Sequence, residues 1–234
     1  MLISIVTPAL EEAETVPVRG REIACQEGPY EWIVSDGGSS DATVARAQAA
    51  GAIVVASARG RGVQLDSGAA RATGDVLLFL HADTALPVDA LAAVRRALGD
   101  PDIVGGNFTL RFDEGTWTAA LFAAVYALQQ RLFGVYFGDS AIFIRRETFD
   151  RVRGFGNLPI MEDYEFVRKL ARAGRVVKLG SVVTTSARRY RGKPVRSVCL
   201  WFAIALLYRA GVPPRRLRAL YAPHAARVSR NVGT

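Results

Sequence analysis

The strongest constraint on the fold is the alternation of short apolar runs with helix-compatible stretches over the first hundred residues. Four strands are predicted from apolar or β-branched runs, at 2–7, 31–35, 53–56 and 76–80. Helices are predicted between them from helix-compatible segments, at 11–22, 42–50 and 63–72, of which the last two are rich in alanine. This alternation is typical of parallel strands joined by right-handed crossovers, so the sequence predicts an α/β fold with a mostly parallel sheet.

The pattern becomes less regular beyond residue 100. Further helices are predicted at 87–98, 117–132, 162–173, 195–209 and 214–221. Further strands are predicted at 103–112, 140–145, 176–179 and 182–185, and Gly105-Gly106 indicates a bulge or a close backbone approach in the first of them. Because there is no repeat, low-complexity tract or clear linker, we predict a single domain over 1–234.

Composition limits the choice of partner and compartment. The net charge of +8 favours an anionic partner, which leaves open nucleic acid, an acidic membrane surface or a phosphorylated small molecule. Two cysteines, Cys25 and Cys199, are too few and too far apart for a disulfide framework or a zinc site, which favours the cytoplasm. The apolar stretches 117–133 and 198–208 fall at or below the ~20 residues of a membrane-spanning helix. Contact with a membrane surface stays open.

Two predicted strands end in acidic residues. The run 76–80 leads into His81-Ala82-Asp83, and the run 31–35 leads into Asp36 followed by two glycines. Because ligands bind at the carboxyl ends of parallel strands, these two ends predict one site.

Several ordered motifs together resemble those of the GT-A-fold glycosyltransferases of family 2, inverting enzymes that use nucleotide-diphosphate sugars. The motifs are Thr7-Pro8-Ala9-Leu10-Glu11-Glu12, Asp36-Gly37-Gly38-Ser39-Ser40-Asp41, Gly60-Arg61-Gly62 with Gln64 and Gly68, His81-Ala82-Asp83, Gly138-Asp139 and Glu162-Asp163. The resemblance covers roughly residues 1–190. It implies a Rossmann-like three-layer α/β/α sandwich with a nucleotide-binding half at 1–100, an acceptor-binding half at 101–190 and a helical C-terminal segment at 191–234.

The resemblance implies a donor site at the strand ends. The residues implied to bind the donor nucleotide are Pro8, Ala9, Glu11, Asp36, Arg61 and Ala82. Asp36 would accept from the imide N–H of a pyrimidine, which favours a UDP-sugar, and Arg61 would neutralise the diphosphate. Because the family's asparagine-glutamate pair is replaced by Glu11-Glu12, either Glu11 or Glu12 could be the matching glutamate. Asp66 stands where the family commonly has asparagine, and the sequence offers no explanation for it.

The resemblance also implies a metal and a catalytic base. Asp83 would coordinate Mn²⁺ or Mg²⁺, while His81 either ligates the same ion, only orients Asp83 or contacts the ribose. Asp163 would remove the proton of the acceptor hydroxyl, with Glu162 in support. Asp139, Arg188 and Tyr190 would contact the donor or the acceptor.

Alternative functions are a non-catalytic scaffold that binds nucleotide or nucleic acid, and a nucleotidyltransferase. The first turn lacks the glycine-rich basic loop of a nucleotidyltransferase, and the aromatics are not interleaved with arginines as nucleic-acid binding requires. The 80–84 segment is most similar to a small bacterial subgroup linked with arsenosugar biosynthesis. The sequence does not identify the acceptor. The apolar stretches 117–133 and 198–208 could pack on the core, contact a membrane or form a homodimer interface.

Overall fold

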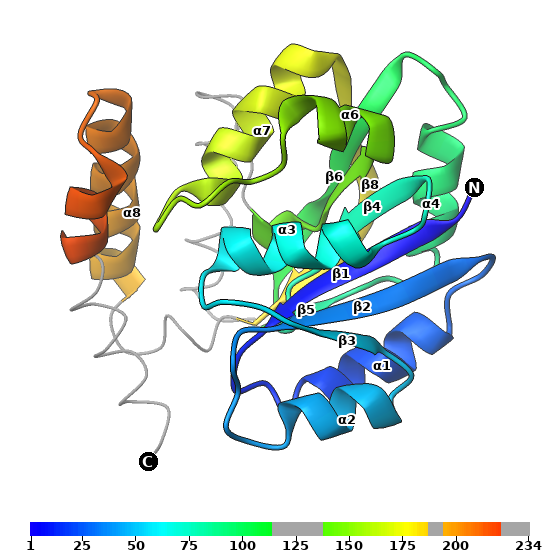
Figure 1. Cartoon of the computed structure of the whole chain (residues 1–234). Helices are drawn as coiled ribbons and strands as arrows, with labels where there is room; N and C mark the ends of the chain where they lie inside the picture. Colours follow the sequence, from blue (N-terminus) through cyan, green and yellow to red (C-terminus); the bar gives the residue numbers. More distant parts are fainter. Residues whose placement is uncertain (114–137, 187–193, 221–234) are drawn as a thin grey trace.

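In the computed structural model, one eight-stranded sheet forms the centre of the molecule (Figure 1). The structure describes residues 1–113, 138–186 and 194–220. The strands follow the order β3-β2-β1-β4-β7-β6-β8-β5. Their bounds are β1 Ile3–Ala9, β2 Tyr30–Asp36, β3 Ile53–Ala56, β4 Val76–Phe79, β5 Thr84–Ala85, β6 Ile103–Phe112, β7 Ile142–Arg145 and β8 Arg175–Thr185. The β3-β2-β1-β4 half is parallel, and β7 joins it to β6 through two antiparallel pairings.

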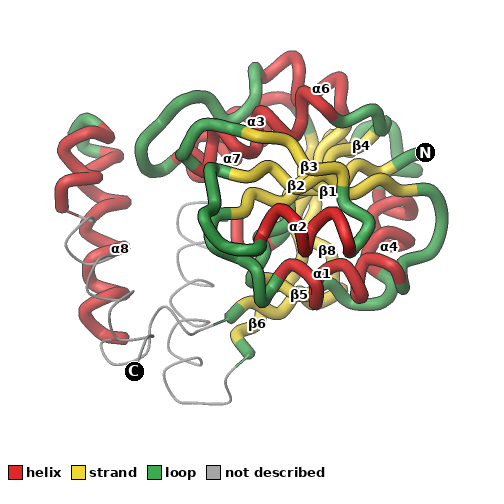
Figure 2. Tube along the Cα trace, turned by 60° about the horizontal axis from the view of Figure 1, so that its bottom comes forward, coloured by secondary structure: helices red, strands yellow, loops and turns green. Residues whose placement is uncertain are grey.

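Helices cover both faces of the sheet (Figures 1 and 2). One face carries α1 Val16–Ala24, α2 Thr43–Ala49 and α4 Ala90–Ala97, and the other carries α3 Arg61–Arg71, α6 Arg146–Val152 and α7 Glu162–Ala173. Side chains alternate along a strand, so β4 sends Val76 and Leu78 into the first core and Leu77 and Phe79 into the second. The predicted three-layer α/β/α fold is therefore confirmed.

The register of the parallel strands brings their carboxyl ends to one edge. Ala9, the last residue of β1, lies opposite Asp36, the last residue of β2, and Val6 lies opposite Phe79 of β4. The N–H of Leu80 still donates to the carbonyl of Val6, 2.9 Å away, so the chain leaves the sheet just before the His81-x-Asp83 segment. The two acidic strand ends are thus placed on the same edge, as predicted.

The first helix begins later than predicted. The sequence predicts a helix over 11–22, whereas α1 spans Val16–Ala24 and Pro17 lies in its first turn. Residues 11–13 instead form a turn whose N–H groups donate to side chains of the β2–α2 loop and of Thr43 at the start of α2. Because those acceptors come from 28 to 31 residues further along the chain, the local sequence pattern could not reveal them.

Beyond β4, the structure departs from the prediction in several elements. The predicted strands 176–179 and 182–185 form one strand, β8, whose pairing with β6 shifts register between Leu179 and Val182. The two-residue β5 and the helix α6 were not predicted. The close approach predicted at Gly105-Gly106 is confirmed, since a Cβ on Gly105 would lie 2.5 Å from the carbonyl oxygen of Phe143.

The C-terminal part of the described chain is helical. α8 spans Pro194–Arg209, and residues 214–220 are also helical, close to the predicted ranges. Within the part of the chain that the structure describes, no helix has the length and apolar character needed to cross a membrane. The predicted helix 117–132, Arg188 and Tyr190 lie outside the described residues.

Candidate active site

A cavity of about 240 Å³ opens at the carboxyl edge of β1 and β4. It is lined by Pro8, Ala9, Leu10, Glu12, Arg61, Gln64, His81, Ala82 and Asp83. These residues come from the ends of β1 and β4 and the first turn of α3, which are distant in sequence. The structure therefore brings together six of the residues that the sequence assigned to donor and metal binding.

Gln64 fixes the ends of β1 and β2 beside the cavity. Its buried side-chain amide donates to the carbonyl of Ala9 at 2.7 Å and to the carbonyl of Ser35 at 3.0 Å. A Cβ on Gly37 would lie 3.0 Å from the same amide nitrogen, so the glycine allows the loop after β2 to close over Gln64. Both backbone carbonyls are thus satisfied beside the cavity.

Asp36 holds the loop after β2 with both carboxylate oxygens. One oxygen accepts from the N–H groups of Gly38 and Ser39, at 2.9 and 3.0 Å, and the other accepts from the Ser39 hydroxyl at 2.5 Å. Asp36 is buried and is not among the residues that line the cavity. Its observed contacts define the shape of the loop.

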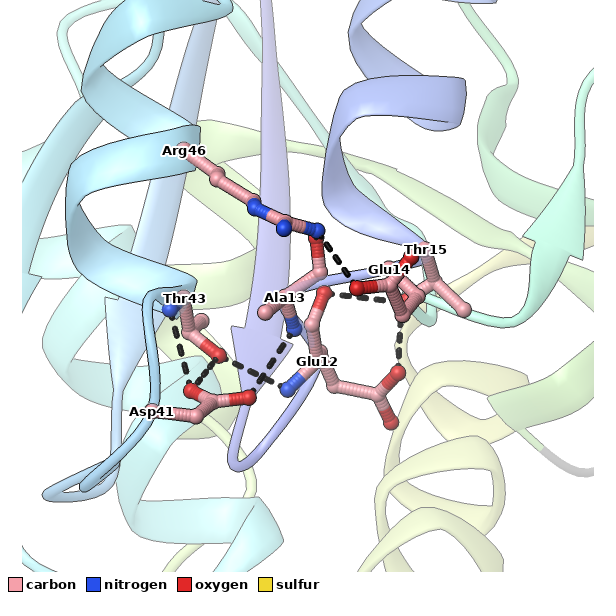
Figure 3. Close-up of polar contacts among 7 residues, drawn as sticks. All are labelled: Glu12, Ala13, Glu14, Thr15, Asp41, Thr43 and Arg46. Carbon is pink, nitrogen blue, oxygen red and sulfur yellow. Dashed lines mark hydrogen bonds and ion pairs between the residues drawn. The ribbon is translucent and has the colours of Figure 1, made fainter.

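The acidic segment after β1 is tied to the start of α2 (Figure 3). Asp41 accepts from the N–H of Ala13, and Thr43 accepts from the N–H of Glu12 at 2.8 Å. Glu12 lines the main cavity, whereas Glu11 turns to Ser40 and accepts from its N–H at 2.8 Å. Either glutamate could match the motif by sequence. The structure places Glu12 at the cavity and Glu11 against the loop after β2.

A short helix, η1 Gly138–Ser140, connects the β4 end to the predicted base. The Nδ1 of His81 lies 2.9 Å from a carboxylate oxygen of Asp139, and the N–H of Gly138 donates to Asp163 at 3.1 Å. An ionised carboxylate only accepts hydrogen bonds, so the contact with Asp139 places a proton on Nδ1 of His81. The other oxygen of Asp163 accepts from the N–H of Tyr164 at 2.8 Å. Asp163 is consequently held at both oxygens.

Gly138 leaves room for the imidazole of His81. A Cβ at this position would lie 2.8 Å from Nε2 of His81, closer than side chains tolerate. One ring nitrogen of His81 therefore faces Asp139 and the other packs against Gly138, and only 10% of the side chain is exposed. Because these contacts are made with Asp139 and Gly138, the role of His81 toward a metal or Asp83 stays a prediction.

Glu162 joins the cavity wall to the first turn of α7. Its carboxylate lies 3.4 Å from Nη1 of Arg61, and its side chain is 7% exposed. Burial raises the pKa of Glu162, Arg61 opposes the rise by favouring the charged form, and Asp163 adds to it by repulsion. The ion pair places Glu162 and Asp163 beside the basic residue that the sequence assigned to the diphosphate.

The raised pKa of Glu162 leads to a prediction about stability and pH. A carboxyl group whose pKa is higher in the folded state contributes stability below its unfolded value, near 4.5, and loses it as pH rises through the folded value. Glutamine carries no charge to desolvate, so we expect Glu162→Gln to unfold at a higher temperature than the wild type at pH 7.5. The difference should vanish below pH 4.5, and 1 kcal/mol corresponds to about 2–4 °C in a chain of this size.

Thermal unfolding from pH 4 to pH 8 measures this effect. Glu147→Gln, at an exposed position in α6, is the matched control and should leave the midpoint unchanged. A lower midpoint for Glu162→Gln at pH 7.5 would mean that the ion pair with Arg61 outweighs the cost of burial.

Asp66, which the sequence left unexplained, anchors the loop before α7. Its two carboxylate oxygens accept from the N–H groups of Phe155 and Gly156, both at 2.9 Å. Further along this loop the chain enters α7 at Glu162 and Asp163, and the carbonyl of Gly156 would lie 2.6 Å from a Cβ on Gly62. The sequence showed only that Asp66 is an acid where the family commonly has asparagine. Its role depends on contacts with residues about 90 positions further along the chain, which the sequence alone does not show.

Replacing Asp66 tests this anchoring role. Asp66→Ala leaves two partly buried N–H groups without acceptors, so we expect it to lower the free energy of unfolding by about 1–3 kcal/mol. Asp66→Asn keeps one acceptor oxygen and should fall between Asp66→Ala and the wild type. Chemical denaturation measures the order, with Asp150→Ala at an exposed position of α6 as the control. Equal stability of Asp66→Ala and the control would contradict the assignment.

The residues at the cavity fit a divalent cation that is shared with a bound diphosphate. Among residues 1–113, 138–186 and 194–220, no group of three or more His, Cys, Asp or Glu side chains could hold a metal ion by itself. Asp83 nevertheless lines the cavity, as does Arg61. Mg²⁺ and similar ions are commonly bound by one or two carboxylates together with substrate phosphates and water. Asp83 is therefore the residue that would hold the ion.

The fold and the cavity together define a class of protein. A sheet whose parallel half ends in a carboxylate-bearing cavity, with a second pair of acids at the start of α7, is the arrangement of a GT-A glycosyltransferase. The model of the family described as "Glycosyl transferase family 2" matches residues 4–152. The chain belongs to glycosyltransferase family 2, which confirms the resemblance drawn from its motifs.

Solved structures show the same fold at low sequence identity. A mannosyltransferase from Pyrobaculum calidifontis, in complex with GDP-Man and Mn²⁺, is 21% identical with a TM-score of 0.70, over 97% of this chain and 73% of that one. Glucosyl-3-phosphoglycerate synthase from Mycobacterium tuberculosis, with Mn²⁺, UDP and glucosyl-3-phosphoglycerate, is 23% identical with a TM-score of 0.61, over 91% and 81%. The 1–349 fragment of S. aureus TarS, with UDP-GlcNAc, is 16% identical with a TM-score of 0.64, over 80% and 58%. No curated protein matches the chain.

Proposed function

We propose that this protein is an inverting glycosyltransferase that moves a sugar from a nucleotide-diphosphate sugar to an acceptor hydroxyl. The observation that carries the proposal is the connection of the donor cavity to Asp163. Arg61 on the cavity wall pairs with Glu162, and the neighbouring Asp163 is held by η1, which also contacts His81 at the end of β4. The contacts thus connect the arginine that would bind the diphosphate to the aspartate that would act as base.

The donor would lie across the ends of β1 and β4. Pro8, Ala9 and Ala82 line the cavity and would contact the nucleoside, and Asp36 would contact the base from the neighbouring loop. Arg61 suits diphosphate oxygens because its guanidinium offers a planar set of donors. A Mn²⁺ or Mg²⁺ ion on Asp83 would supply further neutralisation of the leaving diphosphate.

Asp163 would take the proton of the acceptor hydroxyl as that oxygen attacks the anomeric carbon. The new bond forms on the face opposite the diphosphate, and the bond between the anomeric carbon and the diphosphate oxygen breaks. The electron pair of that bond leaves with the diphosphate, whose charge Arg61 stabilises. One displacement of this kind inverts the anomeric configuration.

The narrower features of the proposal concern donor, subgroup and compartment. Asp36 supports a UDP-sugar through the hydrogen bond its carboxylate could accept from a pyrimidine, and the 80–84 segment supports the bacterial subgroup linked with arsenosugar biosynthesis. Cys25 and Cys199 are both exposed and free, which suits the reducing cytoplasm.

The stereochemistry is tested with water as the acceptor. Many transferases slowly hydrolyse their donors, and proton NMR identifies the anomer released before mutarotation. With an α-linked donor such as UDP-glucose or GDP-mannose, at high protein concentration, the proposal expects the β-anomer to accumulate first. Initial release of the α-anomer would contradict inversion, and a control without protein gives the spontaneous background.

A further inference from the structure

Helix α8 carries an apolar surface that the described protein leaves uncovered. No charged residue occurs between Arg196 and Arg209, so the helix is apolar around its circumference. A helix of that kind is normally buried, yet only Ile204 and Ala205 are buried among residues 199–209. Apart from Arg209, the exposed residues in this range are Cys199, Ala203, Leu206 and Leu207, whose spacing of four, seven and eight places them on one face. Leu206 is 53% exposed and Leu207 is 37% exposed.

The part of the sequence that contains α8 is basic and has no acidic residues. All 22 Asp and Glu residues lie in the first 165 positions, while 16 of the 30 Lys and Arg residues lie in 166–234. Arg209, Arg215, Arg216 and Arg218 are exposed on α8 and on the following helical segment 214–220. Leu220 at the end of that segment is 52% exposed. We call the exposed residues Cys199, Ala203, Leu206, Leu207, Arg215, Arg216, Arg218 and Leu220 the α8 surface.

The α8 surface is anchored to the acceptor half of the enzyme. The Tyr208 hydroxyl donates to Glu165 at 3.2 Å, and Arg209 donates to the Tyr164 hydroxyl at 3.3 Å. The rings of Tyr164 and Tyr208 meet edge to face with centroids 5.5 Å apart. Figure 1 shows α8 standing at the outer side of α7, the helix whose first turn carries Asp163.

We propose that the α8 surface docks on an anionic lipid bilayer. Exposed leucines beside arginines are the composition of helices that lie in a membrane interface, where apolar side chains enter the acyl boundary and basic ones meet anionic headgroups. A second copy of the chain is a poorer partner, because it would bring two arginine-rich and acid-free surfaces together. Nucleic acid is also a poorer partner, because Leu206 and Leu207 offer no ring for base stacking. The proposal stands independently of the glycosyl transfer proposed above.

Co-sedimentation with vesicles tests the proposal. The full chain is mixed with vesicles of phosphatidylcholine alone, and with vesicles that contain 30% phosphatidylglycerol, at low and high salt. We expect binding to the anionic vesicles only, weakened at high salt because exposed charges are then screened. Arg215→Gln/Arg216→Gln should weaken it about 25-fold, since each basic residue near the surface contributes about fivefold. Leu206→Gln/Leu207→Gln should weaken it about tenfold or more.

Two control variants match these changes elsewhere on the molecule. Arg71→Gln/Arg151→Gln removes the same net charge from exposed positions on α3 and α6, and Val88→Gln removes an apolar side chain that is 77% exposed. Both should bind vesicles like the wild type, and all variants should keep the wild-type melting temperature.

Three results would overturn the proposal. One is equal binding to neutral and anionic vesicles, and another is no binding by the folded wild-type chain. The third is a dimer in light scattering that Leu206→Gln/Leu207→Gln converts to a monomer while vesicle binding is unchanged, which would assign the α8 surface to contact between copies.

Discussion

Replacing Asp163 with asparagine is expected to lower the transfer rate by about 10²–10⁴-fold and to leave nucleotide affinity nearly unchanged. A positioned general base contributes an effect of this size, and the amide cannot take up the acceptor proton. The asparagine oxygen can still accept from the N–H of Gly138 or of Tyr164, so the first turn of α7 should stay in place. Rates measured with UDP-glucose or GDP-mannose as donor report the effect on transfer, and calorimetric titration with the nucleotide reports the effect on affinity.

Asp150→Asn provides the control for Asp163→Asn, since it makes the same chemical change at an exposed position of α6. It should keep both rate and affinity. If Asp163→Asn lost nucleotide affinity and kept its rate at saturating donor, Asp163 would belong to donor binding and another group would have to act as base.

Replacing Asp83 with alanine should have the opposite pattern. Asp83 lines the same cavity as Arg61 and would hold the cation, so its loss should remove the gain in nucleotide affinity that Mn²⁺ provides. We expect at least a tenfold loss, because removing even an outer partner of a metal ligand costs about 10–100-fold in metal affinity. Calorimetric titration with and without Mn²⁺ measures it.

Asp102→Ala, at an exposed loop position, is the matched control for Asp83→Ala and should bind like the wild type. Unchanged metal dependence in Asp83→Ala would show that the cation is held by other residues, and the role of Asp83 would then be limited to shaping the cavity.

The parallel half of the fold could be predicted because its signals are local. Each strand of that half is a short apolar run, and each loop after it carries glycine or acid, so both the sheet and its functional edge follow from short segments. The beginning of α1 could not be predicted in the same way. Residues 11–13 satisfy their N–H groups with Ser39, Asp41 and Thr43, and such distant acceptors override a local helix-compatible pattern.

The composition of the cavity was also largely predictable, whereas its supporting contacts were not. Pro8, Arg61 and Asp83 follow from motifs and do meet at one cavity. The contact of His81 with Asp139 and the anchoring of the 154–156 loop by Asp66 depend on how η1 and α3 pack. The pattern of the sequence identifies such residues as polar, and only the packed structure shows which backbone groups they satisfy.

We expect the cavity to bind a nucleoside diphosphate together with a divalent cation. Calorimetric titration of the wild-type protein with UDP and with GDP, each with and without Mn²⁺, tests it most directly. We expect one of the two nucleotides, UDP, to bind tightly, and we expect its binding to require Mn²⁺. Absence of binding by either nucleotide in a folded sample with Mn²⁺ present would contradict the account.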